Sequence, residues 1–286
     1  MTPETLPKIN PDLIKKHLDA VARPRDIFQN PETLREVQIY IEDELISYGY
    51  QIYRDLFRLE GQTFENVVAT SASSLQQKRF IIGAHFDAVA GTHGADDNAS
   101  GIAAMLEAAR ILSNSTVVSK IDFVAFNAEE HGVTGSACYA GKLKETGAKL
   151  FGMISLEMVG FTAQGKGSQQ LPFFLRPFYP DIGNFLALVG DHQSSKLLQT
   201  AKKAFSKVEA LPVETLSVPA KGRMMPETRL SDHANFWDAG YPALLVTDTS
   251  FFRNPHYHKP TDRVETLDLE FLARVTEGVA HLAFSI

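Results

Sequence analysis

The sequence predicts a single three-layer α/β domain in which a central mixed, mostly parallel β-sheet is flanked by helices. Apolar runs of strand length alternate with segments of helical periodicity along most of the chain, which is typical of a sheet covered by helices on both faces. The length of 286 residues is within the range of one large α/β domain. No internal repeat or linker-like composition divides the chain, so the domain is expected to span residues 1–286.

Helical periodicity appears first at Leu34, Val37, Ile41 and Leu45, which share one helix face, and Gly49 is placed to end the last turn. The other expected helices cover residues 102–112, 135–146, a segment that begins near 194, and 272–282. The expected strands are 66–72, 79–87, 120–128, 152–159, 185–191 and 243–250. Two segments, 160–181 and 217–231, interrupt the alternation, and long irregular loops of this kind are often functional.

The charge balance and the cysteine content exclude several classes of protein. The 28 basic and 34 acidic residues give a net charge of −6 without a long basic run, so no nucleic-acid partner is expected. The chain starts without a signal-peptide pattern and has no stretch near the roughly 18 apolar residues of a membrane span, so a cytoplasmic protein without membrane association is expected. The one cysteine, Cys138, excludes an internal disulfide. Composition does not indicate an oligomeric state.

Acids and histidines gather where the apolar runs end. Ligands of an open α/β sheet bind at the carboxyl ends of its strands, so these side chains are the candidates for a site. They are His85, Asp87, Asp96, Asp97, Glu129, Glu130, Glu157, His256, Tyr257, His258 and Asp262. Several carboxylates in one crevice repel one another unless a cation lies between them. Imidazole and carboxylate ligands without cysteine favour zinc or a similar divalent ion, and the number of acids suggests two ions bridged by a carboxylate.

Most of these residues also have an ordinary structural interpretation. His85 alone would be a core histidine, but Asp87 lies two residues on and can orient its imidazole. The acids Asp96 and Asp97 are also favoured at the N-terminus of a helix, which leaves their role ambiguous in isolation.

The later candidates differ in how well an ordinary interpretation fits them. Glu129 and Glu130 could face solvent in a loop after a strand, whereas Glu157 has apolar neighbours on both sides and fits a surface position poorly. His256 and His258 lie two residues apart and would share one face of an extended segment, so either could be the ligand.

Taken together, these residues resemble the zinc aminopeptidases of the M28 peptidase family, those with a single catalytic domain of bacterial type. The matching stretches lie between residues 80 and 265 and are "GAHFD", "GADDNASG", "NAEEHGVTGS", "LEMVG", "SDHANFWDAGYPAL" and "HYHKPTD". The combination is far more specific than any one of them. The resemblance implies a zinc-dependent exopeptidase fold and a peptide substrate.

The resemblance also implies roles for individual residues. Five residues are similar to the ligands of two zinc ions, with Asp97 as the bridging carboxylate: His85, Asp97, Glu130, Glu157 and His258. Glu129 matches the general base, which takes a proton from metal-bound water, and Asp87 matches the partner of His85. Asp262 is expected to support His258 in the same way, and Tyr257 lies where some members place a tyrosine that binds the developing oxyanion. One departure is Glu157, because the family usually has aspartate there.

Other residues near these motifs have less specific interpretations. Asp232 and His233 are expected to have a structural role or to support the site, rather than to bind metal. Arginines and apolar residues that could meet a substrate are Arg223, Arg229, Met224, Met225, Phe251 and Phe252, although solvation and core packing are the ordinary interpretations. The function implied is a dizinc aminopeptidase. The alternatives are a glutaminyl cyclase, a carboxypeptidase-like or dipeptidase-like relative, and a binding module without catalysis.

Overall fold

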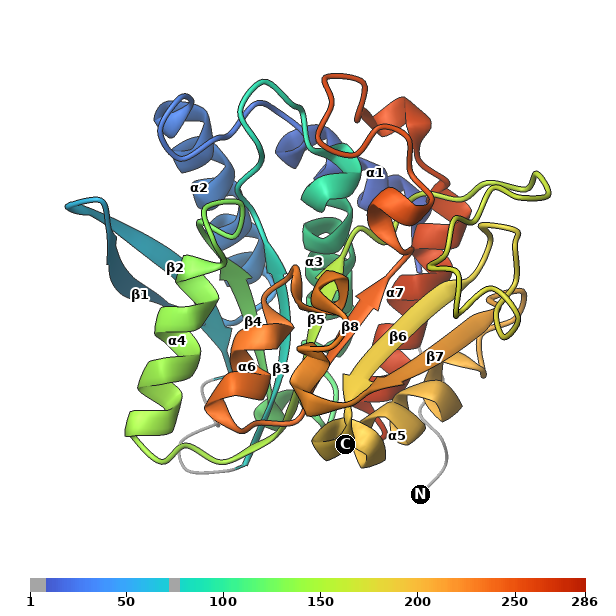
Figure 1. Ribbon diagram of the computed structural model, residues 1–286. Coiled ribbons are helices and arrows are strands. Elements are labelled where there is room, and N and C mark those ends of the chain that lie inside the picture. The colour runs from blue at the N-terminus through green and yellow to red at the C-terminus, as the bar shows by residue number, and fades with distance from the viewer. Residues whose placement is uncertain (1–8, 72–77) are drawn as a thin grey trace.

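An eight-stranded sheet forms the centre of the computed structural model, which describes residues 9–71 and 78–286 (Figure 1). The strands are β1 (Gln51–Leu59), β2 (Gln62–Thr70), β3 (Arg79–His85), β4 (Ile121–Phe126), β5 (Leu150–Glu157), β6 (Leu186–Asp191), β7 (Val213–Val218) and β8 (Ala243–Thr247). They are ordered β1-β2-β4-β3-β5-β8-β6-β7. The pairs β3–β4, β3–β5, β5–β8 and β6–β7 are parallel, and the other three are antiparallel. The prediction of a mixed, mostly parallel sheet is confirmed.

Helices cover both faces of this sheet, which confirms the three predicted layers (Figure 1). One face carries α1 (Pro11–Val21), α2 (Pro31–Ser47), α3 (Gly101–Leu112), α5 (Ser195–Phe205) and α7 (Leu269–Ala283), and the other carries α4 (Thr134–Glu145) and α6 (His233–Ala239). Successive side chains of a strand point to opposite faces, so Phe80 and Ile82 of β3 join the larger apolar core while Ile81 joins the smaller one.

The predicted elements are found close to their expected bounds. The periodic segment 34–45 lies inside α2, and Gly49, with φ +92°, adopts after that helix the left-handed conformation that glycine accepts without strain. The predicted strand 66–72 is the second half of β2, although residue 72 lies outside the described residues. Residues 160–181 contain no helix or strand, as expected of an irregular segment.

The sequence analysis missed α1, β1, β7 and α6. The helix α1 carries a readable signal that was overlooked, because its buried residues Ile14, His17, Leu18 and Val21 share one face. The other three have physical reasons that differ. The edge strands β1 and β7 each pair with one neighbour; β1 is largely exposed and β7 is mostly half-buried, so neither presents a clear alternation of apolar and polar residues. The helix α6 has only seven residues, and four of them, His233, Ala234, Phe236 and Trp237, are buried, which hides its amphipathic pattern.

The parallel strands β4, β3, β5 and β8 end at the same edge of the sheet, and the loops that follow them meet there. The positions predicted to bind metal lie at this edge. Within the described ranges, no helix combines the length and the apolar character needed to cross a bilayer.

Candidate metal centre

Five predicted ligands converge at the carboxyl edge of the sheet from five separate segments. His85 and Glu157 are the last residues of β3 and β5, and Glu130 lies in the loop after β4. Asp97 lies in the turn that leads into α3, and His258 lies in the loop between β8 and α7. The sequence separates these residues by up to 173 positions, and the sheet brings them together.

Two groups of ligand atoms share Asp97. The Nε2 atom of His85 lies 3.3 Å from Oδ1 of Asp97 and 3.4 Å from Oε1 of Glu157. The Nε2 atom of His258 lies 3.2 Å from Oδ2 of Asp97 and 3.3 Å from Oε2 of Glu130. Within each group the donor atoms lie within 4.8 Å of one another. The two oxygens of Asp97 therefore face different histidines, as a bridging carboxylate would.

Glu129 borders the same cluster without belonging to either of these two groups. Its Oε2 atom lies 3.9 Å from Nε2 of His85, and it forms a third possible group with His85 and Glu130. The side chain is buried among acids, with 9% of the residue exposed. A carboxylate beside the ligands can exchange a proton with a molecule bound between them.

Burial and neighbouring charges shift the pKa values of the residues in the cluster. Burial raises the pKa of Glu129 well above its usual value, and burial together with the charge of Asp97 raises the pKa of Glu130 to about 7. Burial lowers the pKa of His258, but hydrogen bonds to Asp97 and Glu130 outweigh it and raise this pKa to about 10. The cluster thus takes up protons when no other cation is available to it.

The donor set fits divalent transition-metal ions. It consists of imidazole nitrogen and carboxylate oxygen without sulfur, which suits zinc. The buried Oε1 atom of Glu130 has no hydrogen-bond partner among the residues that the structure describes. A buried oxygen without a partner is costly, and a metal ion would satisfy it.

Two aspartates hold the loops of the cluster through the backbone. The carboxylate of Asp87 accepts hydrogen bonds from the N–H groups of Glu129 and Glu130, both 3.1 Å, and its Oδ1 atom lies 3.4 Å from Nδ1 of His85. The predicted partner of His85 is therefore beside it. Asp262 accepts hydrogen bonds from the N–H groups of Asp96 (2.9 Å) and Asp97 (3.1 Å). It supports the backbone of Asp97, whereas support of His258 was expected.

The structure separates the two histidines that the sequence left as alternatives. His258 faces Asp97 and Glu130, whereas the Nδ1 atom of His256 lies 3.0 Å from the hydroxyl of Thr261. The segment is a turn rather than an extended strand, and His258 has φ +56°, so the two side chains do not share a face. The ring of Tyr257 stacks on that of His258 with 3.7 Å between centroids.

Arg25 is a site residue that the sequence analysis missed. Its fully buried guanidinium donates four hydrogen bonds, to the carbonyl oxygens of Phe86 (2.7 Å), Arg23 (3.1 Å), His93 (2.6 Å) and Gly94 (2.9 Å). Burial lowers its pKa to about 10, against the opposing charges of the neighbouring acids. No motif around residue 25 marks it, because its partners are main-chain atoms distant in sequence.

Ser231 is a second residue without a predicted role. Its hydroxyl donates a hydrogen bond of 2.7 Å to Oε2 of Glu157, the predicted ligand that departs from the family pattern. The next residue, Asp232, is buried, and burial raises its pKa to about 7. His233 contacts the carbonyl oxygen of Thr228 (2.8 Å) and the ring of Trp237, so it supports the fold, as expected, and lies outside the groups of ligands.

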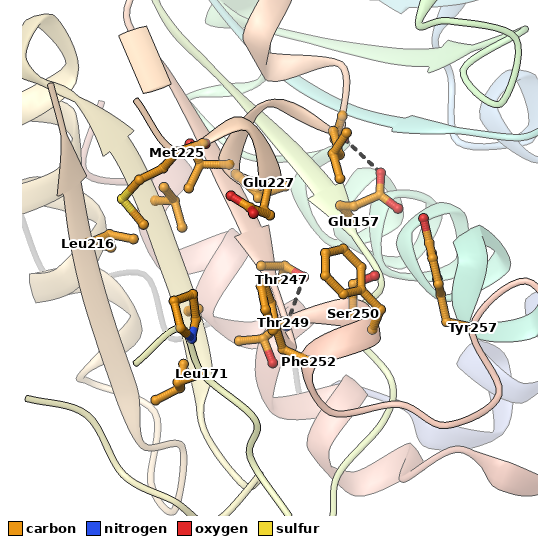
Figure 2. A pocket seen from close by; sticks show the side chains of 18 of the residues that line it. Glu157, Leu171, Leu216, Met225, Glu227, Thr247, Thr249, Ser250, Phe252 and Tyr257 are labelled. Atoms are coloured by element: carbon orange, nitrogen blue, oxygen red, sulfur yellow. Dashed lines mark hydrogen bonds between the residues drawn. The ribbon is translucent and has the colours of Figure 1, made fainter. Parts of the chain in front are cut away.

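A cavity that is partly open to solvent extends from the cluster over β6 and β7 (Figure 2). Its walls come from both irregular segments, from β6, β7 and β8 and from the loop after β8, and they include Leu171, Leu175, Leu216, Met225, Phe251 and Phe252. Figure 2 shows Glu157 and Tyr257 at one end and Leu171 and Leu216 toward the other.

Three of the residues considered as substrate contacts lie elsewhere. Met224 is 75% exposed and does not line the cavity. Arg229 donates hydrogen bonds to the carbonyl oxygen of Lys221 (2.7 Å) and to Asp238 (2.6 Å). Arg223 is directed to the same aspartate, at 3.7 Å. Both arginines are therefore neutralised outside the cavity.

The sequence of this chain is similar to those of known proteins. Residues 66–283 match Peptidase family M28. The uncharacterized protein YfbL of Escherichia coli (strain K12) is 33% identical, with 99% of this chain and 90% of that protein covered. A probable zinc metalloprotease of Leptosphaeria maculans is 30% identical over 76% of this chain and 56% of its own length, and the chain spans about half the length of such fungal relatives.

Solved structures agree with the fold. The LapA aminopeptidase of Legionella pneumophila has a TM-score of 0.76 at 20% identity and covers 97% of this chain and 71% of its own. A glutaminyl cyclase of Fimbriiglobus ruber has a TM-score of 0.76 at 17% identity and covers 99% and 97%. The predicted exopeptidase-like fold is confirmed.

Proposed function

We propose that this chain, which belongs to peptidase family M28, is a dizinc aminopeptidase that removes N-terminal residues from peptides. The family confirms the predicted resemblance and the prediction of a zinc-dependent peptidase. The observation that carries the finer proposal is Asp97, whose two oxygens face His85 and His258 in two separate groups of ligands.

The proposed ligands divide into two sets. His85 and Glu157 would hold one zinc ion, Glu130 and His258 would hold the other, and Asp97 would bridge them. Bound zinc would polarise the peptide carbonyl and lower the pKa of a water molecule. The acids of the cluster would then be deprotonated, because the ions replace the protons that the cluster otherwise takes up.

Glu129 is proposed as the general base. It takes a proton from the attacking water and returns it to the nitrogen of the departing amine, and its buried position beside the ligands supports this role. Asp87 orients the imidazole of His85 and holds the backbone of Glu129 at the same time. Burial keeps the hydroxyl of Tyr257 protonated by raising its pKa, so it can donate a hydrogen bond to the developing oxyanion.

Hydrolysis of aminoacyl chromogenic substrates by the zinc-loaded protein tests this proposal. A chelator should abolish turnover, zinc should restore it, and elemental analysis should find two zinc ions per chain. Glu129→Gln should keep both ions and lower kcat by about 10²–10⁴-fold. Near-normal turnover by this variant would remove Glu129 from the mechanism.

A glutaminyl cyclase is the second candidate, because such an enzyme is among the structures that share the fold. Two complete groups of metal ligands favour the peptidase, since the cyclases use a single zinc ion. An assay for cyclisation of N-terminal glutamine, together with the zinc content, separates the two. Peptides blocked at the N-terminus or at the C-terminus distinguish an aminopeptidase from a carboxypeptidase or dipeptidase.

A further inference from the structure

The cavity beside the metal centre combines apolar walls with two acids that the proposed catalysis does not use. Glu214 of β7 and Glu227 of the segment before α6 both line it. Among the described residues, its lining contains no lysine or arginine, and its one histidine is His258, which is proposed as a metal ligand. The cavity is therefore able to attract positive charge along an apolar path.

Glu227 is exposed to solvent, and its carboxylate is directed into the open part of this cavity. Figure 2 shows its carboxylate between Met225 on one side and Glu157 on the other, above Thr247. Among the residues that the structure describes, the Glu227 side chain forms no hydrogen bond or ion pair. The two arginines nearest to it in sequence, Arg223 and Arg229, are directed to Asp238 instead.

The backbone that carries Glu227 is held in place by its neighbours. Pro226 precedes it, and the hydroxyl of the buried Thr228 donates a hydrogen bond of 2.7 Å to the carbonyl oxygen of Met225. The side chain of Arg229, the residue after Thr228, donates a hydrogen bond to the carbonyl oxygen of Lys221. A carboxylate on a fixed segment is a better determinant of specificity than one on a mobile loop, because the segment loses less conformational entropy when a ligand binds.

A purely apolar ligand would fit this cavity poorly. It would displace water from Glu227 without supplying a partner, and desolvation of an unpaired carboxylate is unfavourable. A long alkyl chain with a cationic end avoids this, because the chain packs on Leu216 and Met225 while the cation pairs with the acid. Lysine and arginine side chains have this form.

We propose that the cavity binds the basic side chain of an N-terminal lysine or arginine and that Glu227 is the residue that selects it. This inference rests on the proposed aminopeptidase function. It names the substrate class as peptides with a basic first residue. Glu227 acts on specificity, while the metal centre and Glu129 act on the bond that is broken.

Two substrates that differ only in the cation test the inference. Lysine and norleucine p-nitroanilides share a four-carbon side chain, and only lysine carries the ammonium group. The zinc-loaded wild type should have the higher kcat/KM for lysine. In Glu227→Gln, the ratio of the lysine to the norleucine value should fall by about tenfold or more, the loss typical of a charge-assisted hydrogen bond, while the norleucine value stays within about threefold. Glu209→Gln, an exposed acid outside the cavity, is the matched control and should leave the ratio unchanged.

Two results would overturn the inference. An unchanged ratio in Glu227→Gln would show that the acid does not meet the side chain. An equal loss of kcat/KM for both substrates would mean that Glu227 contacts the α-amino group, which both substrates share, or that it stabilises the fold.

Binding measurements separate this inference from the proposed function. If the wild type hydrolyses no aminoacyl substrate, the aminopeptidase proposal fails, and calorimetric titration of the zinc-loaded protein with free L-lysine and L-norleucine decides the inference by itself. Tighter binding of lysine that is lost in Glu227→Gln supports it, and equal binding of the two amino acids refutes it.

Discussion

Arg25→Met removes a cation and four hydrogen bonds from the base of the metal centre. The guanidinium donates hydrogen bonds of 2.6–3.1 Å to the carbonyl oxygens of four residues: Arg23, Phe86, His93 and Gly94. Methionine fills much of the volume but leaves these buried oxygens without donors and leaves the nearby acids without a positive charge. Loss of one partner from a buried ionic network costs about 3–5 kcal/mol, and we expect the free energy of unfolding to fall by that amount. Arg25→Lys keeps the charge with fewer donors and should lose less.

Urea unfolding of the metal-free protein measures this effect, and elemental analysis after dialysis against zinc shows whether the site survives. The matched control is Arg23→Met, because the Arg23 side chain is 38% exposed and its ion pair with Glu36 lies at the surface. Such a pair contributes about 0–1 kcal/mol. If Arg25→Met cost no more than Arg23→Met, the hydrogen bonds of the buried guanidinium would not stabilise the site.

Three further outcomes are expected. Burial lowers the pKa of His17 to about 4 in the folded protein. Between pH 6.5 and 4 the unfolded chain therefore binds a proton at His17 that the folded protein does not bind, so the free energy of unfolding decreases as the pH falls. Between pH 7.5 and pH 5 this decrease is about 2 kcal/mol. Urea unfolding at the two pH values should detect the decrease in the wild type but not in His17→Phe. Asp262→Asn replaces the acceptor of two N–H groups at Asp96 and Asp97, so zinc affinity measured by competition with a chelator should fall about 10–100-fold, and unaltered affinity would contradict that support. Gly278→Ala should lower the unfolding free energy by about 1–3 kcal/mol in urea, because its Cβ would lie 2.1 Å from Cδ1 of Phe205; a neutral result would mean that α5 and α7 can separate without cost.

The parts of the fold that the sequence predicts are those in which burial is one-sided or complete. The strands β3, β4, β5 and β8 are buried on both faces and read as continuous apolar runs, and α2 and α7 show a clear apolar face. The edge strands and α6 lack such a signal. Their structure depends on neighbours distant in the chain, which local patterns do not record.

The candidate site divides in the same way. His85, Glu130 and Glu157 could be identified as candidates because each follows or ends an apolar run, whereas the resemblance to the family was needed to select Asp97 and His258. Asp262 was noticed but assigned to His258, since sequence cannot show that its carboxylate reaches the backbone of Asp96, 166 residues away. Ser231 was not singled out, because a serine in a polar loop has many ordinary interpretations until its 2.7 Å contact with Glu157 is seen.

Residues that precede the family region are also parts of the site. The match to the family begins at residue 66, whereas Arg25 binds the carbonyl oxygens of Phe86 and Gly94. Its neighbour Asp26 lies 3.0 Å from Nε2 of His131, directly after the paired acids of the β4 loop. These two contacts fix the segment between α1 and α2 against the loops that carry His85 and Glu130. A cluster of repelling carboxylates needs both a nearby cation and a rigid backbone. The N-terminal helices position one such cation, the guanidinium of Arg25, and hold the loops of the cluster in place. The functional unit is therefore larger than the region in which the motifs occur.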